Sequence, residues 1–196
     1  MLQKVINKVF SNPTIFIQVR RVLENNFKGE KEVIQRELNL EGTTLDIACG
    51  TGEFCQFFKK EKYLGVDLSE KYIEYAKKKY GYNFQVMDAT KMKVEEKFDN
   101  ILVCGVFHHL NDEAVLTILH SAKSLIRDDG RILVMEDMPT VSKMNVIGKV
   151  VQHFDVGKFI RKHEAYGELY KKELKVVKEH RMRSGVNDYS VYVLEK

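Results

Sequence analysis

The sequence predicts an α/β fold: a doubly wound, mostly parallel sheet of seven strands that ends in an antiparallel hairpin and carries cap helices at its N-terminus. After Gly42, short apolar runs alternate with helical stretches, which is typical of βαβ units and a parallel sheet. The C-terminal segment breaks this alternation with two strand-like runs around a turn at 184–188, which is typical of a hairpin. The 196 residues have the length of a single domain.

Two apolar stripes at the start of the chain predict the cap helices. Their residues recur three and four positions apart, so each set falls on one face of a helix. The stripes are Leu2, Val5, Ile6, Val9 and Phe10, then Ile15, Phe16, Val19, Val22 and Leu23. Between them, Asn12 and Pro13 are typical of a new helix start, and a third, short helix is predicted over 30–38.

The middle of the chain predicts five strands of the parallel sheet. They cover 44–48, 63–66, 84–87, 101–106 and 131–135. Helices are predicted from about residue 52, from about residue 70, and from about residue 112 to 126. The two hairpin strands are predicted over 176–182 and 189–194.

Charge and cysteine content narrow the class of protein. Lys plus Arg number 32 against 28 Asp plus Glu, and this net charge of +4 is too small to indicate nucleic-acid binding by itself. Cys49, Cys55 and Cys104 are odd in number and lack metal-ligand spacing, so we expect no metal site and a reducing, cytoplasmic setting. No apolar run approaches the roughly 20 residues of a membrane span.

The most informative segment is LDIACGTG, residues 45–52, where an apolar strand ends in a turn with two glycines. Gly50 and Gly52 allow positive φ and let a ligand approach the backbone without a Cβ in the way. The helix predicted next would offer free amides and a partial positive charge at its N-terminus. The dinucleotide fingerprint requires a third glycine where Cys55 stands, so the turn suits a ligand without a pyrophosphate.

Two acids end the next two predicted strands. Asp67 follows the strand at 63–66, where a carboxylate can accept both hydroxyls of a ribose. Asp88 follows the strand at 84–87 and can accept a hydrogen bond from an exocyclic amine. Three successive strand ends therefore offer a glycine turn, a ribose acceptor and an adenine acceptor.

Taken together, these motifs resemble those of the class I S-adenosylmethionine-dependent methyltransferases of the small, Rossmann-like kind. LDIACGTG is similar to the first motif of that family, GVDLS to the second and MDA to the third. FDNILVCGVFHHL and LIRDDGRILVMED are similar to its fourth-strand and fifth-strand segments, and SVYVLEK to its closing strand. The resemblance runs from about residue 45 to 137, and Ala48 stands at the position of the first glycine of the turn.

The resemblance implies S-adenosylmethionine as cofactor, S-adenosylhomocysteine as product, and a set of cofactor-binding positions. Around the methionine portion these are Asp46, the backbone of Ala48, Gly50, Gly52 and Cys104. Around the adenosine they are Asp67 at the ribose, Leu68 beside the adenine, and Asp88 with Ala89 at the adenine edge. Within one domain, we expect a helical cap (1–40), a cofactor-binding core (41–138), a lid insertion on the substrate side (139–165), and a closing helix and strands (166–196).

His108 and His109 follow the fourth strand, where the resemblance places the transferable methyl group. A neutral imidazole can take a proton from a hydroxyl, amine or thiol, so both are candidate catalytic residues. The alternative is that one ring packs and hydrogen-bonds the start of the next helix at 111–112. Glu136 and Asp137 end the fifth strand and are expected to face the same cavity.

The segment 141–163 is basic and amphipathic. Residues 139–196 hold 12 basic and 7 acidic side chains, against 20 and 21 in the preceding part. We favour a lid that packs its apolar face on the core; the alternatives are a surface that docks on an anionic membrane and one that grips an acidic substrate. The apolar residues at helical spacing are Met144, Ile147, Val150, Val151 and Phe154.

The predicted activity is in-line methyl transfer to a small-molecule acceptor, with lipid-like and isoprenoid-like molecules among the candidates. The alternative from another class is a non-catalytic module that binds the cofactor and regulates a partner. A nicotinamide-dependent oxidoreductase is disfavoured by Cys55, and a nucleic-acid acceptor by the lack of interleaved aromatic and basic residues. We expect a cytoplasmic protein, with peripheral membrane contact through the basic amphipathic segments as the alternative. The pattern does not predict an oligomeric state.

Overall fold

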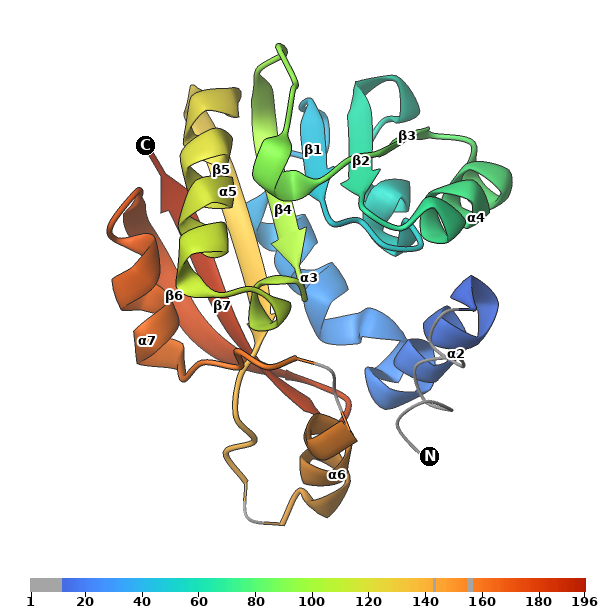
Figure 1. Cartoon of the computed structure of the whole chain (residues 1–196), viewed down its shortest axis with the longest axis vertical. Helices are drawn as coiled ribbons and strands as arrows, with labels where there is room; N and C mark the ends of the chain where they lie inside the picture. The colour runs from blue at the N-terminus through green and yellow to red at the C-terminus, as the bar shows by residue number, and fades with distance from the viewer. Residues whose placement is uncertain (1–11, 143, 155–156) are drawn as a thin grey trace.

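The computed structural model describes residues 12–142, 144–154 and 157–196, so the first predicted apolar stripe, from Leu2 to Phe10, lies outside the described residues. The described chain forms a seven-stranded sheet in the order β3-β2-β1-β4-β5-β7-β6 (Figure 1). Strands β1 to β5 run parallel, whereas β7 runs antiparallel to β5 and β6. The predicted fold class is confirmed.

The strands follow the predicted apolar runs with different ends. They are β1 (Thr44–Ile47), β2 (Tyr63–Asp67), β3 (Asn83–Val86), β4 (Phe98–Cys104), β5 (Ile126–Asp137), β6 (Lys175–Ser184) and β7 (Asn187–Glu195). β4 begins earlier than predicted because Asn100 pairs with Thr44 of β1 and its amide donates to the Thr44 hydroxyl at 2.9 Å. β5 begins at Ile126, before the strand predicted over 131–135, and its pairing with β4 shifts register in this added part.

Six α-helices are described outside the sheet. They are α2 (Pro13–Leu23), α3 (Lys28–Glu37), α4 (Glu70–Tyr80), α5 (Asp112–Leu125), α6 (Val146–Phe154) and α7 (His163–Tyr170). Asn12 caps α2 as predicted, because its side chain accepts from the amides of Thr14 and Ile15. Within the described ranges, no helix has the length and apolar character that crossing a membrane requires.

The helix predicted from about residue 52 is wrong. The chain forms two short 3₁₀ helices instead, η2 (Glu53–Phe57) and η3 (Lys60–Lys62). Gly52 before η2 is left-handed and Phe58 after it is extended, so neither end continues a helix. Tight 3₁₀ turns are the usual way to make so short a connection between two strands.

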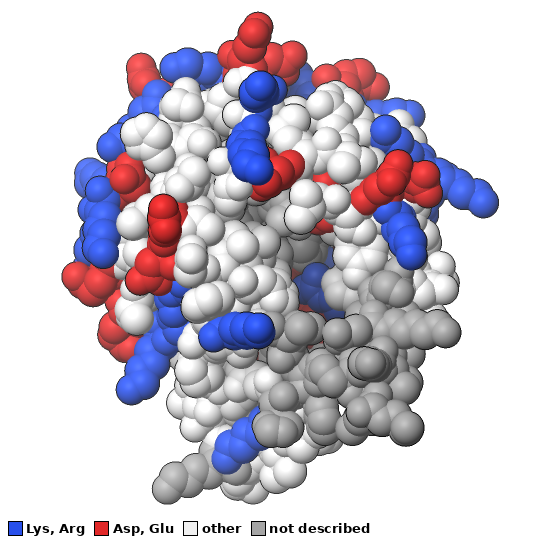
Figure 2. All heavy atoms as spheres, viewed as in Figure 1, with Lys and Arg blue, Asp and Glu red and all other residues white. Residues whose placement is uncertain are grey.

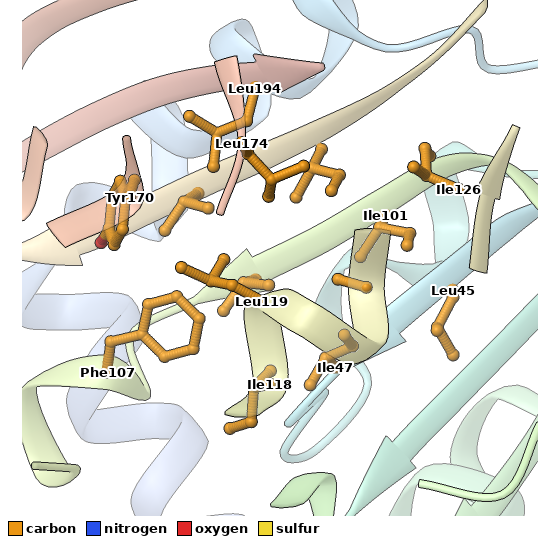
Figure 3. Packing of buried hydrophobic residues seen from close by; sticks show 14 of the residues in the cluster. Leu45, Ile47, Ile101, Phe107, Ile118, Leu119, Ile126, Tyr170, Leu174 and Leu194 are labelled. Atoms are coloured by element: carbon orange, nitrogen blue, oxygen red, sulfur yellow. The ribbon is translucent and has the colours of Figure 1, made fainter. Parts of the chain in front are cut away.

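The buried side chains of the strands alternate between the two faces of the sheet, because successive strand residues point to opposite sides. On β5, Val134 joins the cluster beneath α5 and α7, whereas its neighbour Met135 joins the cluster beneath α3 and α4. Figure 3 shows the first cluster, in which Leu119 of α5 packs among strand residues such as Ile47 and Ile101. Helices therefore cover both faces of the sheet and leave its carboxyl edge for a site.

The segment around α6 does not pack as the favoured prediction expected. Its apolar side chains are 49–92% exposed: Val141, Met144, Val146, Ile147 and Val150. α6 contacts the body through polar groups instead, since the Asn145 side chain donates to the Val186 carbonyl and the Gln152 side chain donates to the Met138 carbonyl. A lid with its apolar face on the core is therefore wrong for these residues.

Candidate functional site

The carboxyl ends of β1, β2 and β4 meet at one edge of the sheet. β1 pairs with β2 on one side and with β4 on the other, so the connections leave this point in opposite directions. Such a switch point opens a crevice in doubly wound folds. Figure 2, seen from the same side as Figure 1, shows a hollow beside the end of β4 with a basic side chain at its floor. The loops after these strands form the candidate site.

The turn after β1 takes three left-handed residues, Ala48, Gly50 and Gly52, with φ angles of 58°, 55° and 75°. A Cβ added at Gly50 would meet no atom within 4 Å, whereas one added at Gly52 would lie 2.7 Å from the ring of Phe84. Gly52 is therefore required by packing inside the protein. Gly50 instead exposes its backbone to open space, where a ligand can lie against it.

Asp67 joins the ends of β1 and β2. Its Oδ2 accepts a hydrogen bond from the Gly50 amide at 2.9 Å, and its Oδ1 accepts one from the Ser69 amide at 2.8 Å. Burial raises the pKa of Asp67, although both hydrogen bonds favour the carboxylate. Each oxygen keeps a further lone pair, so Asp67 can hold the glycine turn and accept ligand hydroxyls together.

Asp46 lies beneath the glycine turn rather than at its open side. Its side chain is almost fully buried and accepts a 2.6 Å hydrogen bond from the Tyr63 hydroxyl. Burial raises the pKa of Asp46 to about 7. Asp46, which the sequence assigned to the methionine portion, therefore binds Tyr63 of β2 inside the protein.

The residues assigned to the adenine lie on the exposed side of the same edge. Leu68 is 72% exposed, directly after Asp67. Asp88 lies two residues past the end of β3 and accepts from both the hydroxyl and the amide of Thr90, and these bonds lower the pKa of Asp88. Ala89 begins the 3₁₀ helix η4 (Ala89–Lys91) and is half-buried. An apolar side chain and a carboxylate therefore flank the edge beyond Asp67.

Glu136 organises the loop after β4. One carboxylate oxygen accepts from the amides of Val106 and Phe107 at 2.9 and 2.8 Å, and the other accepts from the His108 amide at 3.3 Å. That second oxygen also lies 2.9 Å from Nδ1 of His108, and Nε2 of His108 lies 3.8 Å from the Asp137 carboxylate. Glu136 is fully buried, so its part is to fix the 3₁₀ helix η5 (Phe107–His109) and the His108 ring.

The two histidines differ in environment. His108 is buried, whereas His109 is exposed and its ring lies against that of His108 at a tilt of 45°, with ring centres 4.0 Å apart. Asn111 caps the start of the next helix, α5, because its side chain accepts a hydrogen bond from the Ala114 amide. The sequence left open that one histidine ring packs and bonds the helix start at 111–112. His108 does pack inside the protein, but its ring nitrogen Nδ1 contacts Glu136.

Arg20 of α2 reaches the end of β4, and the sequence did not single it out. A Cβ added at Gly105 would lie 3.9 Å from both Arg20 Nη2 and His108 Cε1, so the two side chains flank this glycine. Arg20 donates twice to Glu24, at 2.7 and 2.9 Å. Its spacing from Glu24 was visible in the sequence, but such pairs are common on exposed helix surfaces.

Cys104 ends β4 beside this group and is buried. Burial raises the pKa of its thiol, so the sulfur stays protonated and is a poor nucleophile. The Cys104 side chain therefore acts as packing at the end of β4.

The comparisons with known proteins agree on one family. Residues 44–130 match the model of the family described as "Methyltransferase domain". Residues 44–130 are therefore similar to a methyltransferase domain. The sequence resemblance is confirmed.

Relatives of this methyltransferase domain are distant. An uncharacterized methyltransferase from Alkaliphilus oremlandii (strain OhILAs) is 27% identical over 136 residues, which cover 67% of this chain and 62% of that protein. The chain thus spans about three-fifths of the length of this relative. A methyltransferase structure from Clostridium acetobutylicum ATCC 824 has a TM-score of 0.66 at 15% identity and covers 92% of this chain and 97% of that one.

The magnesium protoporphyrin IX methyltransferase of Synechocystis PCC 6803, solved with bound S-adenosylhomocysteine, also shares the fold. Its TM-score is 0.69 at 17% identity, covering 98% of this chain and 100% of that one. The methyltransferase domain of the present chain contains all the residues assigned to the cofactor, from Asp46 to Cys104. Arg20, Asp137 and α6 lie outside the matched range, so the family model says nothing about them.

Proposed function

We propose that this chain is an enzyme that transfers a methyl group from S-adenosylmethionine to a small-molecule acceptor. The observation that carries the proposal is Gly50, whose backbone faces open space while Asp67 holds its amide. This arrangement lies at the switch point of a methyltransferase domain.

The residues present fit the cofactor. Gly50 leaves room beside the turn for the methionine portion, and the Asp67 carboxylate suits the two hydroxyls of a ribose. Leu68 offers an apolar surface to the adenine, and Asp88 an acceptor for its amine. When bound, the cofactor supplies an electrophilic methyl group on a sulfonium.

The chain's own part in the reaction is to align the acceptor and exclude water. Alignment in line with the carbon–sulfur bond can lower the barrier by roughly 7–11 kcal/mol. α2 stands over the open side of the edge, because Phe16 of α2 stacks on Tyr72 of α4 with ring centres 5.0 Å apart. Arg20 and His108 then flank the acceptor side at Gly105.

His108 is the proposed proton acceptor for substrates that react through a hydroxyl. Glu136 contacts Nδ1 and so fixes the ring orientation, and Nε2, which lies 3.8 Å from the Asp137 carboxylate, is the nitrogen proposed to take a proton. His109 is exposed, and we assign it no step. An amine acceptor would need no such base.

A small-molecule acceptor is favoured by the relative that methylates magnesium protoporphyrin IX. We include lipid-like and isoprenoid-like molecules in the same proposal because exposed apolar side chains of α6 follow directly on β5. No observation in the described part of the chain favours a non-catalytic regulatory module.

Asp67→Ala tests the cofactor assignment. Loss of the charge-assisted acceptor should weaken S-adenosylmethionine binding by about 1–3 kcal/mol, measured by calorimetry on the purified protein. Asp88→Ala is the matched control at the adenine edge, where a smaller loss is expected because Asp88 is more exposed and caps η4. Equal affinity of Asp67→Ala and the unmodified protein would overturn the ribose assignment.

Methyl-labelled S-adenosylmethionine and a host-cell extract test the reaction and the acceptor class. The expected result is labelled product that is lost with Asp67→Ala, and partition between organic and aqueous phases separates lipid-like from polar acceptors. Cofactor binding without labelled product in either phase would favour the regulatory module instead.

A further inference from the structure

The loop before α6 and the first turns of α6 present an apolar surface, here called the α6 face. Its members are Val141, Met144, Val146, Ile147 and Val150, all exposed. Among the described residues this is the longest run of exposed apolar side chains close together in sequence. We propose that the α6 face docks this protein on the surface of an anionic lipid bilayer.

The helix geometry fixes which way the α6 face points. At about 100° per residue, Val146, Ile147 and Val150 fall within an arc of about 100° on α6. Gly148 and Gln152 lie on the other side, where Gln152 donates to the Met138 carbonyl and a Cβ on Gly148 would strike the Val186 carbonyl at 2.5 Å. The body of the protein therefore occupies the polar side of α6 and leaves the apolar side to solvent.

The contacts of Asn145 hold this orientation. Its side chain donates to the Val186 carbonyl at 2.7 Å and accepts from the Gly148 amide at 2.9 Å. Asn145 is itself buried, so a largely buried side chain fastens α6 to the turn between β6 and β7. Turning the apolar residues inward would break these bonds, so the α6 face needs a partner from outside.

The charges around the α6 face select an anionic partner. Between residues 139 and 163 the sequence has five basic side chains and one acidic one, although one of the five, Arg161, is paired with Asp112. Lys149 of α6 is exposed, and Arg183 of β6 lines a cavity of about 410 Å³ together with Met144 and Ile147. Arg183 is 48% exposed and its nearest acid, Asp188, is 3.9 Å away, so its guanidinium can bind a phosphate.

The surface view agrees with this distribution. In Figure 2 the described surface at the foot of the molecule, around α6, shows uncharged and basic side chains and no acidic ones on this side. An anionic bilayer offers phosphates to the basic groups and, next to them, the boundary of the acyl chains to the apolar groups. Two copies of the chain joined through this face would instead bring the basic groups together, which is unfavourable.

Vesicle flotation with the full chain tests the proposal, and it needs no methyl acceptor. Vesicles of phosphatidylcholine with and without phosphatidylglycerol are compared at low and high salt. We expect flotation with the anionic vesicles that weakens as salt is added. The double variant Met144→Glu/Ile147→Glu should lower the partition coefficient on the order of tenfold or more, since two apolar contacts are lost and two repulsive charges gained.

The matched control is Val86→Glu, which adds a charge at an exposed apolar residue of β3, at the opposite edge of the sheet from β6. It should float like the unmodified protein. The melting temperature of the double variant should match that of the unmodified protein, because both replaced side chains are exposed. Absence of flotation with anionic vesicles overturns the proposal, as does flotation that the double variant leaves unchanged. A dimer that the double variant dissociates, without any flotation, makes the α6 face a contact between copies instead.

Discussion

Ala48, Gly50 and Gly52 share left-handed φ angles, but their surroundings give them different roles. Gly52 lies against Phe84, Gly50 faces open space, and Ala48 carries its methyl group in a conformation that favours glycine. At the scale of single residues, the same backbone conformation therefore serves internal packing at one position and ligand access at another.

The two glycines should respond differently to alanine. Gly52→Ala should lower the free energy of unfolding by about 1–3 kcal/mol, because its Cβ would lie 2.7 Å from the Phe84 ring. Gly50→Ala should lower the free energy of unfolding by only about 1–2 kcal/mol, through backbone strain. For the same loss of stability, it should weaken cofactor binding clearly more than Gly52→Ala does. Denaturant unfolding and calorimetry on both variants measure the two effects. The reverse pattern would mean that the ligand does not lie against Gly50.

His108 and His109 give a second pair of variants. His108→Gln should lower kcat by about 10²–10⁴ for an acceptor that reacts through a hydroxyl, because the proposed proton acceptor is lost. His109→Gln should change kcat far less, since His109 is exposed and has no assigned step. The pH profile of kcat should lose its acidic limb in His108→Gln only. If the pH profile of kcat in His108→Gln keeps its shape, His108 is a packing residue and not the proton acceptor.

At the scale of elements, α6 and η2 differ from the expectation for two different reasons. Helical spacing of apolar residues predicts a helix but not the neighbour that it packs against. α6 forms as the spacing indicates, yet Asn145 and Gln152 fasten its polar side to the body. For η2, the left-handed Gly52 and the short path to β2 override the helical pattern.

Gly148→Ala tests how α6 is fastened. A Cβ at Gly148 would lie 2.4 Å from the Asn145 side-chain nitrogen and 2.5 Å from the Val186 carbonyl oxygen. The variant should break the bond between Asn145 and Val186, and amide exchange in α6 should become at least several-fold faster while exchange in β1 and β4 stays the same. Val150→Ala, at an exposed position of the same helix, is the control. Unchanged exchange in Gly148→Ala would show that other contacts hold α6.

At the scale of the whole molecule, buried acids make stability depend on pH. Burial raises the pKa of Asp46 from 3.8 to about 7, and burial also raises the pKa of Glu30. Between pH 3.8 and about pH 7, the folded protein keeps a proton on Asp46 that the unfolded chain has lost. The folded state therefore binds more protons, and the free energy of unfolding falls as pH rises through this window.

Asp46→Asn isolates this contribution, because asparagine keeps an acceptor for Tyr63 and does not titrate. From about pH 4 to pH 7 the unmodified protein should lose stability relative to the variant, by an amount of the order of 2–4 kcal/mol. Denaturant unfolding at several pH values measures the difference. A difference that does not change with pH would mean that Asp46 is charged in the folded state.

Much of the fold, and the glycine turn of the candidate site, were predictable from local patterns. Alternating apolar runs and helices, the hairpin at the end, the cap at Asn12 and the glycine turn all depend on residues close in sequence, and the structure has each of them. Arg20 was not predictable in this way, since it meets Gly105 and His108 only when α2 folds over the end of β4.

The sequence by itself determined the class of fold and the similarity of residues 44–130 to a methyltransferase domain, because strand period, turn chemistry and motif spacing are local properties. The tertiary structure decided which side chains face inward. It placed Asp46 under the turn, paired His108 with Glu136 and turned the apolar side of α6 outward. These outcomes depend on contacts between residues far apart in sequence, where burial and the pairing of polar groups decide among orientations that the local pattern leaves equal.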